Sequence, residues 1–172
     1  MIRAMRLDVS LYEEVEKDEN AMNQAVAVVV ISSICAGIGS MISSLSEGGA
    51  GLALVGSIVG MITALIGWFI WSFVTYFVGT RITKGQETKA DYGELLRTIG
   101  FSSSPGVINI LSFIPLVSFI VGIWQLAAMI VAVRQALDFT TNRAILTCIL
   151  GWITYMLLLI LFGGLMAIPF LL

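Results

Sequence analysis

The chain has 172 residues, of which 58% are apolar and only 12% are charged. Soluble domains carry about 25% charged residues, so this composition, with a mean hydropathy of +0.99, excludes a soluble globular domain and indicates an integral membrane protein. The net charge of −2 and the absence of a long basic run exclude nucleic-acid binding. Because the chain has no histidine, the commonest general base and the imidazole metal ligand are both missing, and we expect no cofactor or metal.

Five apolar stretches predict an all-α bundle of five transmembrane helices. Four of the stretches exceed the ~20 residues that a helix needs to cross the hydrocarbon core. Cys35 and Cys148 lie inside two of them and are expected to behave as small buried hydrophobes without a disulfide. The stretches span residues 21–45, 51–79, 102–114, 116–137 and 144–168.

Residues 1–20 are acidic and are predicted to form a cytoplasmic tail with one short amphipathic helix. Ser10 and Glu13 have the spacing of a capping box, after which Leu11, Tyr12 and Val15 fall on one helix face. We interpret the charged residues of the tail as a solvated face, with a docking site for a basic partner as the alternative.

Small residues at four-residue spacing predict close helix packing in the first two spans. In the second span Gly56 and Gly60 form a GxxxG motif, for which we favour packing within the chain over dimerisation. Trp68 and Trp71 share a face of the same span and are interpreted as packing residues. The small residues at this spacing in the first span are Ser32, Ala36 and Ser40.

The third apolar stretch is preceded by a helix start and interrupted by a proline. Asp91 and Glu94 have capping-box spacing and predict a short helix over about 91–100. This helix suits the membrane interface, or it forms the first turns of the third span. Ser104 and Pro105 break the pattern, because the residue before a proline is pushed out of the helical region and proline favours a new helix start.

A second proline, Pro115, follows ten residues after Pro105 and starts the next helix. Ten residues of α-helix reach only about 15 Å, half of a hydrocarbon core of about 30 Å. The third stretch is therefore either a helix that kinks at Pro105 and extends backward, or a half-span with irregular backbone at membrane depth. With the fourth span it forms a tight hairpin over 102–137.

The fourth span ends with Arg134 and Asp138, which are four residues apart and can pair, although the opposite order, with the acid first, would suit a helix better. All nine basic residues fall in the tail, in the second connection and around the fourth. With five spans these regions share one side, which the positive-inside rule assigns to the cytoplasm. We therefore expect a cytoplasmic amino terminus and an outer carboxyl terminus in the cell membrane. The basic residues are Arg3, Arg6, Lys17, Arg81, Lys84, Lys89, Arg97, Arg134 and Arg143.

Several short motifs stand out in the second half of the chain, namely Asp91–Glu94 (DYGE), Leu96–Phe101 (LRTIGF), Pro105-Gly106, Ile114-Pro115, Ala132–Phe139 (AVRQALDF) and Arg143-Ala144. With these motifs the chain resembles prokaryotic members of the Yip (Ypt-interacting protein) family. The resemblance extends from about Tyr12 through the last span and implies a membrane domain of five helices over 21–172 with a cytoplasmic amino terminus. Eukaryotic members act in vesicle trafficking, contact Rab-type GTPases through longer amino-terminal regions and associate with one another; the short tail departs from that pattern.

Three classes of function fit this sequence. The first is a non-enzymatic scaffold that acts through helix packing with itself or with another membrane protein. The second is a lipid-handling protein or small-solute conduit that uses the broken third segment. An enzyme is the third, and we do not expect one because no nucleophile stands beside a base.

The lipid-handling hypothesis also assigns roles to charged residues near the cytoplasmic surface. Arg97 and Arg134 would receive the phosphate of an anionic lipid, with Asp91, Glu94 or Asp138 as counter-charges. The alternative for these residues is snorkelling of the arginines toward water with neighbouring carboxylates that balance their charge.

Overall fold

The computed structural model is a bundle of helices, described here for residues 1–46, 50–85, 88 and 90–167. Among the described helices, four are long and apolar enough to cross a membrane. They are α3 (Ala21–Ser46), α4 (Ala50–Phe77), α6 (Pro115–Ala136) and α7 (Thr141–Ala167). Two positions named above lie outside the described residues. They are residue 168, the last of the predicted fifth stretch, and Lys89, one of the basic residues of the second connection.

The third apolar stretch forms two short helices in place of one long one. The α-helix α5 (Tyr92–Ser102) is followed by the 3₁₀-helix η2 (Ser104–Leu111), so neither piece has the length of a membrane span. The break at Ser104-Pro105 is confirmed, and the helix does extend backward from it to Tyr92. Helix α5 ends at Ser102, two residues beyond the predicted stop near Gly100.

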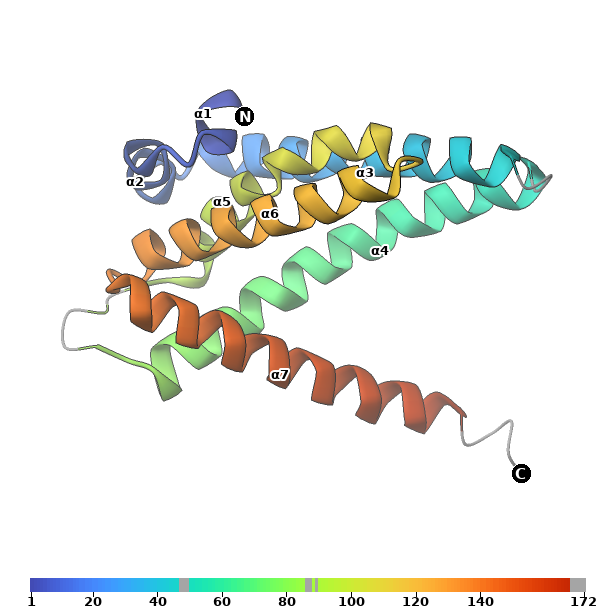
Figure 1. Cartoon of the computed structure of the whole chain (residues 1–172). Coiled ribbons are helices and arrows are strands. Elements are labelled where there is room, and N and C mark those ends of the chain that lie inside the picture. Colours follow the sequence, from blue (N-terminus) through green and yellow to red (C-terminus); the bar gives the residue numbers. More distant parts are fainter. Residues whose placement is uncertain (47–49, 86–87, 89, 168–172) are drawn as a thin grey trace.

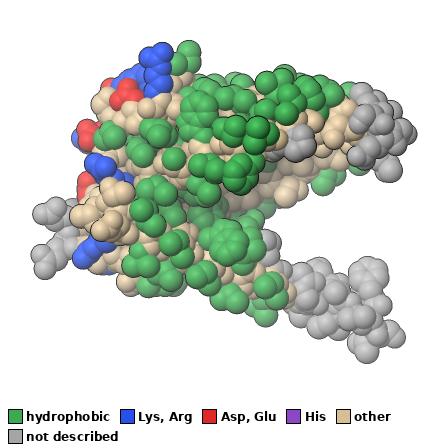
Figure 2. Space-filling view, viewed as in Figure 1, with side chains coloured by type: hydrophobic (Ala, Val, Ile, Leu, Met, Phe, Trp, Pro, Cys, Tyr) green, Lys and Arg blue, Asp and Glu red, His purple; other side chains and the backbone are tan. Residues whose placement is uncertain are grey.

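Charged residues gather at one end of the bundle. Helices α1 (Ile2–Met5) and α2 (Val9–Lys17) lie at this end, where Figure 2 shows nearly all the charged side chains of the visible face. The π-helix η1 (Val78–Ile82), which continues α4, and the beginnings of α5 and α7 lie there too (Figure 1). The last turns of α7 lie at the opposite end.

Helix α5 is the central element of the charged end. Its residues from Leu95 to Ser102 are all buried, because α2, α3, α4 and α6 pack around it. At Gly100 an added Cβ would lie 2.8 Å from Cβ of Ala25, so α5 approaches α3 as closely as a glycine permits. The indole Nε1 of Trp68 donates to the Leu96 carbonyl at 3.2 Å. Helix α5, which the sequence pattern indicated as a helix suited to the membrane interface, is thus enclosed by the neighbouring helices.

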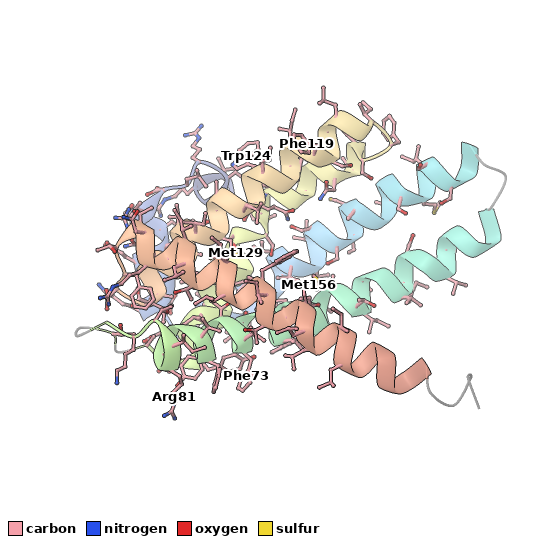
Figure 3. The ribbon with its side chains drawn as sticks, turned by 60° about the horizontal axis from the view of Figure 1, so that its bottom comes forward. Phe73, Arg81, Phe119, Trp124, Met129 and Met156 are labelled. Carbon is pink, nitrogen blue, oxygen red and sulfur yellow. The ribbon has the colours of Figure 1, made fainter. Side chains whose placement is uncertain are left out.

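The amino-terminal tail is docked on this core through its apolar face. Leu11, Tyr12 and Val15 are buried, as their common helix face predicts. The predicted capping box at Ser10 is wrong, because Asp8 caps α2 by accepting from the Ser10 backbone N–H at 3.1 Å. In Figure 3 Trp124 of α6 lies beside the tail, and its Nε1 donates to the Met5 carbonyl at 2.8 Å.

The far end of the bundle is more open. Helix α7 packs on α4 and α6 near the charged end and then diverges from α6 (Figure 1). Only 6% of the residues in the most apolar window of α4 are buried in the chain. Large side chains such as Ile58, Ile62 and Phe73 are therefore exposed. Exposed apolar surfaces of this kind suit contact with lipid chains or with an apolar helix of a second protein.

Candidate functional site

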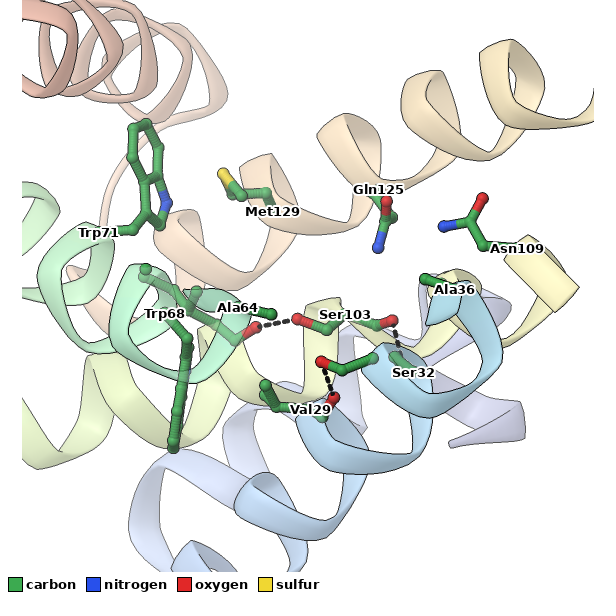
Figure 4. Close-up of a pocket in the computed structure, with 14 residues that line it drawn as sticks. Val29, Ser32, Ala36, Ala64, Trp68, Trp71, Ser103, Asn109, Gln125 and Met129 are labelled. Atoms are coloured by element: carbon green, nitrogen blue, oxygen red, sulfur yellow. Dashed lines mark hydrogen bonds between the residues drawn. The ribbon is translucent and has the colours of Figure 1, made fainter. Parts of the chain in front are cut away.

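A pocket of about 310 Å³ opens beside the break between α5 and η2. We call it the polar pocket, and Figure 4 shows its residues. Its walls come from α3, α4, α5, η2 and α6, so it exists only where these helices meet. The polar side chains that line it are Ser32, Ser33, Trp71, Ser103, Asn109 and Gln125.

The break in the third segment shapes one wall of this pocket. The Ser103 carbonyl accepts from the Ser32 hydroxyl at 2.9 Å, which ties α3 to the break. Gly106 allows the Gln125 amide to come close, because an added Cβ there would lie 2.8 Å from its Nε2. A Cβ on Gly39 would overlap the Asn109 carbonyl, so α3 and η2 are also in close contact. The break itself is thus enclosed by protein, since Ser104, Pro105 and Gly106 are buried.

Three polar groups of the pocket have no hydrogen-bond partner among the described residues. The indole Nε1 of Trp71 is buried and unpaired. The side-chain amides of Asn109 and Gln125 both line the pocket and make no hydrogen bond in the described part of the chain (Figure 4). Unpaired polar groups away from bulk water cost free energy. A polar ligand or bound water would satisfy all three.

A second surface is the groove between α3 and α4, of about 240 Å³. We call it the small-residue groove. Ala36 and Ser40 of α3 and Gly56 and Gly60 of α4 line it. A Cβ added to Gly56 or Gly60 would have no atom within 4 Å in the described chain, so this face of the motif has room for a further side chain or helix. The contact between α3 and α4 runs through Gly37, whose carbonyl accepts from the Ser57 hydroxyl at 3.2 Å.

The third candidate region is the charged end, where Arg97 has a structural partner. Its side chain is 6% exposed and donates from Nε to the Val15 carbonyl at 3.0 Å and from Nη2 to the Glu16 carbonyl. These carbonyls belong to the last turn of α2, where a helix has unpaired acceptors and a negative dipole end. Arg97 is therefore a cap for α2 and not a free surface cation.

The other predicted charged residues have separate roles. Asp91 and Glu94 form the predicted capping box, with bonds of 2.9 and 2.7 Å to each other's backbone N–H groups. Arg134 and Asp138 form no ion pair in the described structure, so the predicted pairing is wrong. The reason is local geometry: α6 ends at Ala136, and Asp138 takes a left-handed conformation with φ of 50°.

Carboxylates at the charged end influence one another. Burial, followed by the charges of Asp138 and Glu94, raises the pKa of Glu16 to about 7. Burial also raises the pKa of Glu94. At the exposed start of α2, bonds from Ser10 and Arg3 lower the pKa of Asp8 to about 2. The Glu16 carboxyl, at the end of α2, thus lies within the electrostatic influence of Asp138 and Glu94 of the core.

Comparison with protein families identifies the chain. A family model, the Yip1 domain, matches residues 10–163. The chain belongs to the Yip1 domain family. Comparison with curated proteins and with solved structures found no match.

The polar pocket and the small-residue groove lie inside the matched Yip1 domain, and so does the charged end apart from residues 1–9. The match begins within α2, so the docked tail helix is part of the domain. The segments that carry the resemblance have clear structural roles, since Asp91 caps α5, Pro105 opens η2 and Pro115 opens α6.

Sequence reasoning missed two features of this Yip1 domain. Gln125 is an amide in the apolar middle of α6, and this polar side chain among apolar ones was the signal from which its place in the pocket could have been inferred. Trp71 was predicted to be a packing residue; it is half-buried and its ring lies 5.9 Å from that of Tyr155, but its N–H faces the pocket unpaired. Its neighbour Trp68 is buried, as predicted.

Proposed function

We propose that this Yip1 domain protein is a non-enzymatic membrane scaffold that associates with a second copy of itself through α4. The observation that carries the proposal is the open GxxxG motif. A Cβ added to Gly37 or Gly39 of α3 would meet other parts of the chain closely, whereas a Cβ added to Gly56 or Gly60 would meet nothing within 4 Å among the described residues. Small residues at this spacing let two helix backbones approach closely.

The exposure of α4 supports the same proposal. With only 6% of its most apolar window buried, this helix contributes little to the interior of its own chain. A second copy of α4 seated in the small-residue groove would cover Gly56 and Gly60 together with Ala36 and Ser40. Association in lipid depends on such close packing, because lipid chains are as apolar as the helices.

Replacing Gly56 and Gly60 with isoleucine is expected to weaken this dimer at least tenfold, about 1.4 kcal/mol. The measurement is native mass spectrometry of protein extracted gently from its membrane, over a range of protein concentrations. Gly122→Ile on α6 is the matched control, since Gly122 is equally open. A wild-type chain that stays monomeric, or a dimer that survives both glycine substitutions, would contradict the proposal.

We also propose a topology for the scaffold with five crossings in the cell membrane, the amino terminus cytoplasmic and the carboxyl terminus outside. Helix α5 has 11 residues and η2 has 8. At rises of about 1.5 and about 2.0 Å per residue they span roughly 32 Å together, close to a hydrocarbon core of about 30 Å. The concentration of basic residues at one end supports the orientation.

The second candidate function is lipid handling or conduction of a small solute. The polar pocket favours it, because broken helices with polar lining often form substrate sites. On the proposed cytoplasmic side Arg134 remains as the contact for the phosphate of an anionic lipid, because Arg97 donates its hydrogen bonds to α2. Asp138, Asp91 and Glu94 remain as the counter-charges.

Native mass spectrometry also tests the anionic-lipid contact. A phosphatidylglycerol adduct that is retained by the wild type and lost in Arg134→Gln would support it. Arg81→Gln serves as the control, because Arg81 is exposed and points away from the bundle (Figure 3). Equal retention of the phosphatidylglycerol adduct in both variants would contradict the contact between Arg134 and the lipid.

A further inference from the structure

The polar pocket adjoins a second cavity on the side of the bundle. This lateral groove, of about 340 Å³, runs between α4, α6 and α7. Trp71 and Met129 line both cavities, so these two side chains mark where the pocket and the groove meet. Each cavity reaches the ~300 Å³ at which sites for small molecules begin.

The two cavities differ in chemistry. The polar pocket holds the three unpaired groups, namely the Trp71 N–H and the amides of Asn109 and Gln125. The lateral groove is lined by apolar side chains, and two of them, Leu126 and Trp152, are 60% and 57% exposed. It therefore opens on the surface that faces lipid. A ligand that fits both cavities has a polar head and an apolar chain.

The polar pocket also restricts the charge of that head. None of the described residues that line the pocket or the groove is ionised at neutral pH. A phosphate or ammonium group would therefore be buried there without a counter-charge, which is costly. Two amides and one indole instead offer both donors and acceptors, which suit hydroxyl and ester or amide groups.

We infer that the polar pocket and the lateral groove together bind an uncharged amphiphile, with its hydroxyl- and carbonyl-bearing head beside Gln125 and its acyl chain between α6 and α7. Diacylglycerols have this chemistry. This site is separate from the charged end, and its ligand differs from the anionic lipid considered there. The inference rests on the second candidate function and is independent of the scaffold.

The test is photo-crosslinking of the full chain in phosphatidylcholine nanodiscs. The probe is a dioleoylglycerol analogue with a diazirine on one acyl chain, and mass spectrometry locates the cross-links. We expect cross-links within 126–130 and 145–152 that unlabelled dioleoylglycerol displaces and that dioleoylphosphatidylglycerol displaces poorly. Cross-links spread over all exposed helix faces, or displacement by the charged lipid alone, would overturn the inference.

Two variants and one control test whether displacement of the cross-linking probe depends on the polar groups of the pocket. Gln125→Leu and Trp71→Phe each remove polar groups that would form hydrogen bonds to the head group of the lipid. Each is expected to raise the concentration of unlabelled dioleoylglycerol that displaces the probe, by up to about tenfold. Gln135→Leu is the control on the same helix, because Gln135 contacts Glu13 at the charged end. Size-exclusion elution confirms that each variant is folded. Equal displacement in all three variants would refute the site.

Transbilayer movement of the lipid, measured in vesicles with the same protein, separates this inference from the function on which it rests. Saturable occupancy without movement would support the site and contradict lipid handling. Movement without saturable occupancy would contradict the site. Neither result affects the dimer proposal, which the α4 variants test.

Discussion

Replacing Arg97 with methionine is expected to release α2 from the helical core. Methionine keeps an apolar stem of similar length but removes both bonds to the Val15 and Glu16 carbonyls. A hydrogen bond that involves a charged group contributes about 1.5–3 kcal/mol. Since the side chain is only 6% exposed, little water can replace these bonds, and we estimate a loss of roughly 3 kcal/mol in tail docking.

Amide hydrogen exchange of residues 9–17 measures this loss directly. A change of 3 kcal/mol raises the opening constant of α2 by about two orders of magnitude. Arg81→Met is the matched control, because Arg81 is exposed and has no hydrogen bond or ion pair among the described residues. Unchanged protection of α2 in Arg97→Met, with protection of α5 also intact, would refute the role of Arg97 as a cap.

Two further predictions concern the pH dependence of docking and the topology. The pKa of Glu16 is raised from 4.5 to about 7 by burial and by Asp138 and Glu94, so docking is favoured at low pH and weakens as pH rises through 7. Protection factors of α2 should fall between pH 5 and pH 8 in the wild type, and a similar fall in Glu16→Gln would contradict this origin. In a cysteine-free background, an impermeant maleimide should label Glu19→Cys from the cytoplasm and Phe113→Cys from outside. Protection of the second site from both sides would refute five crossings.

Helix ends were largely predictable because they depend on neighbours within a few residues. The capping box at Asp91, the break at Pro105 and the start of α6 at Pro115 all appear as expected. Errors arose where two local signals competed. Asp8 caps α2 ahead of Ser10, and the left-handed turn at Asp138 separates it from Arg134.

The sequence by itself determined the membrane class, four of the spans and the family, because apolar length, caps and prolines are local properties of the chain. Tertiary structure alone decided which small residues are covered, as the contrast between Gly39 and Gly60 demonstrates. It also placed Arg97 under α2 and assembled the polar pocket from five helical segments. The physical reason is that burial and cavities depend on how helices far apart in sequence cross, and spacing along one helix does not specify which neighbour will cover it.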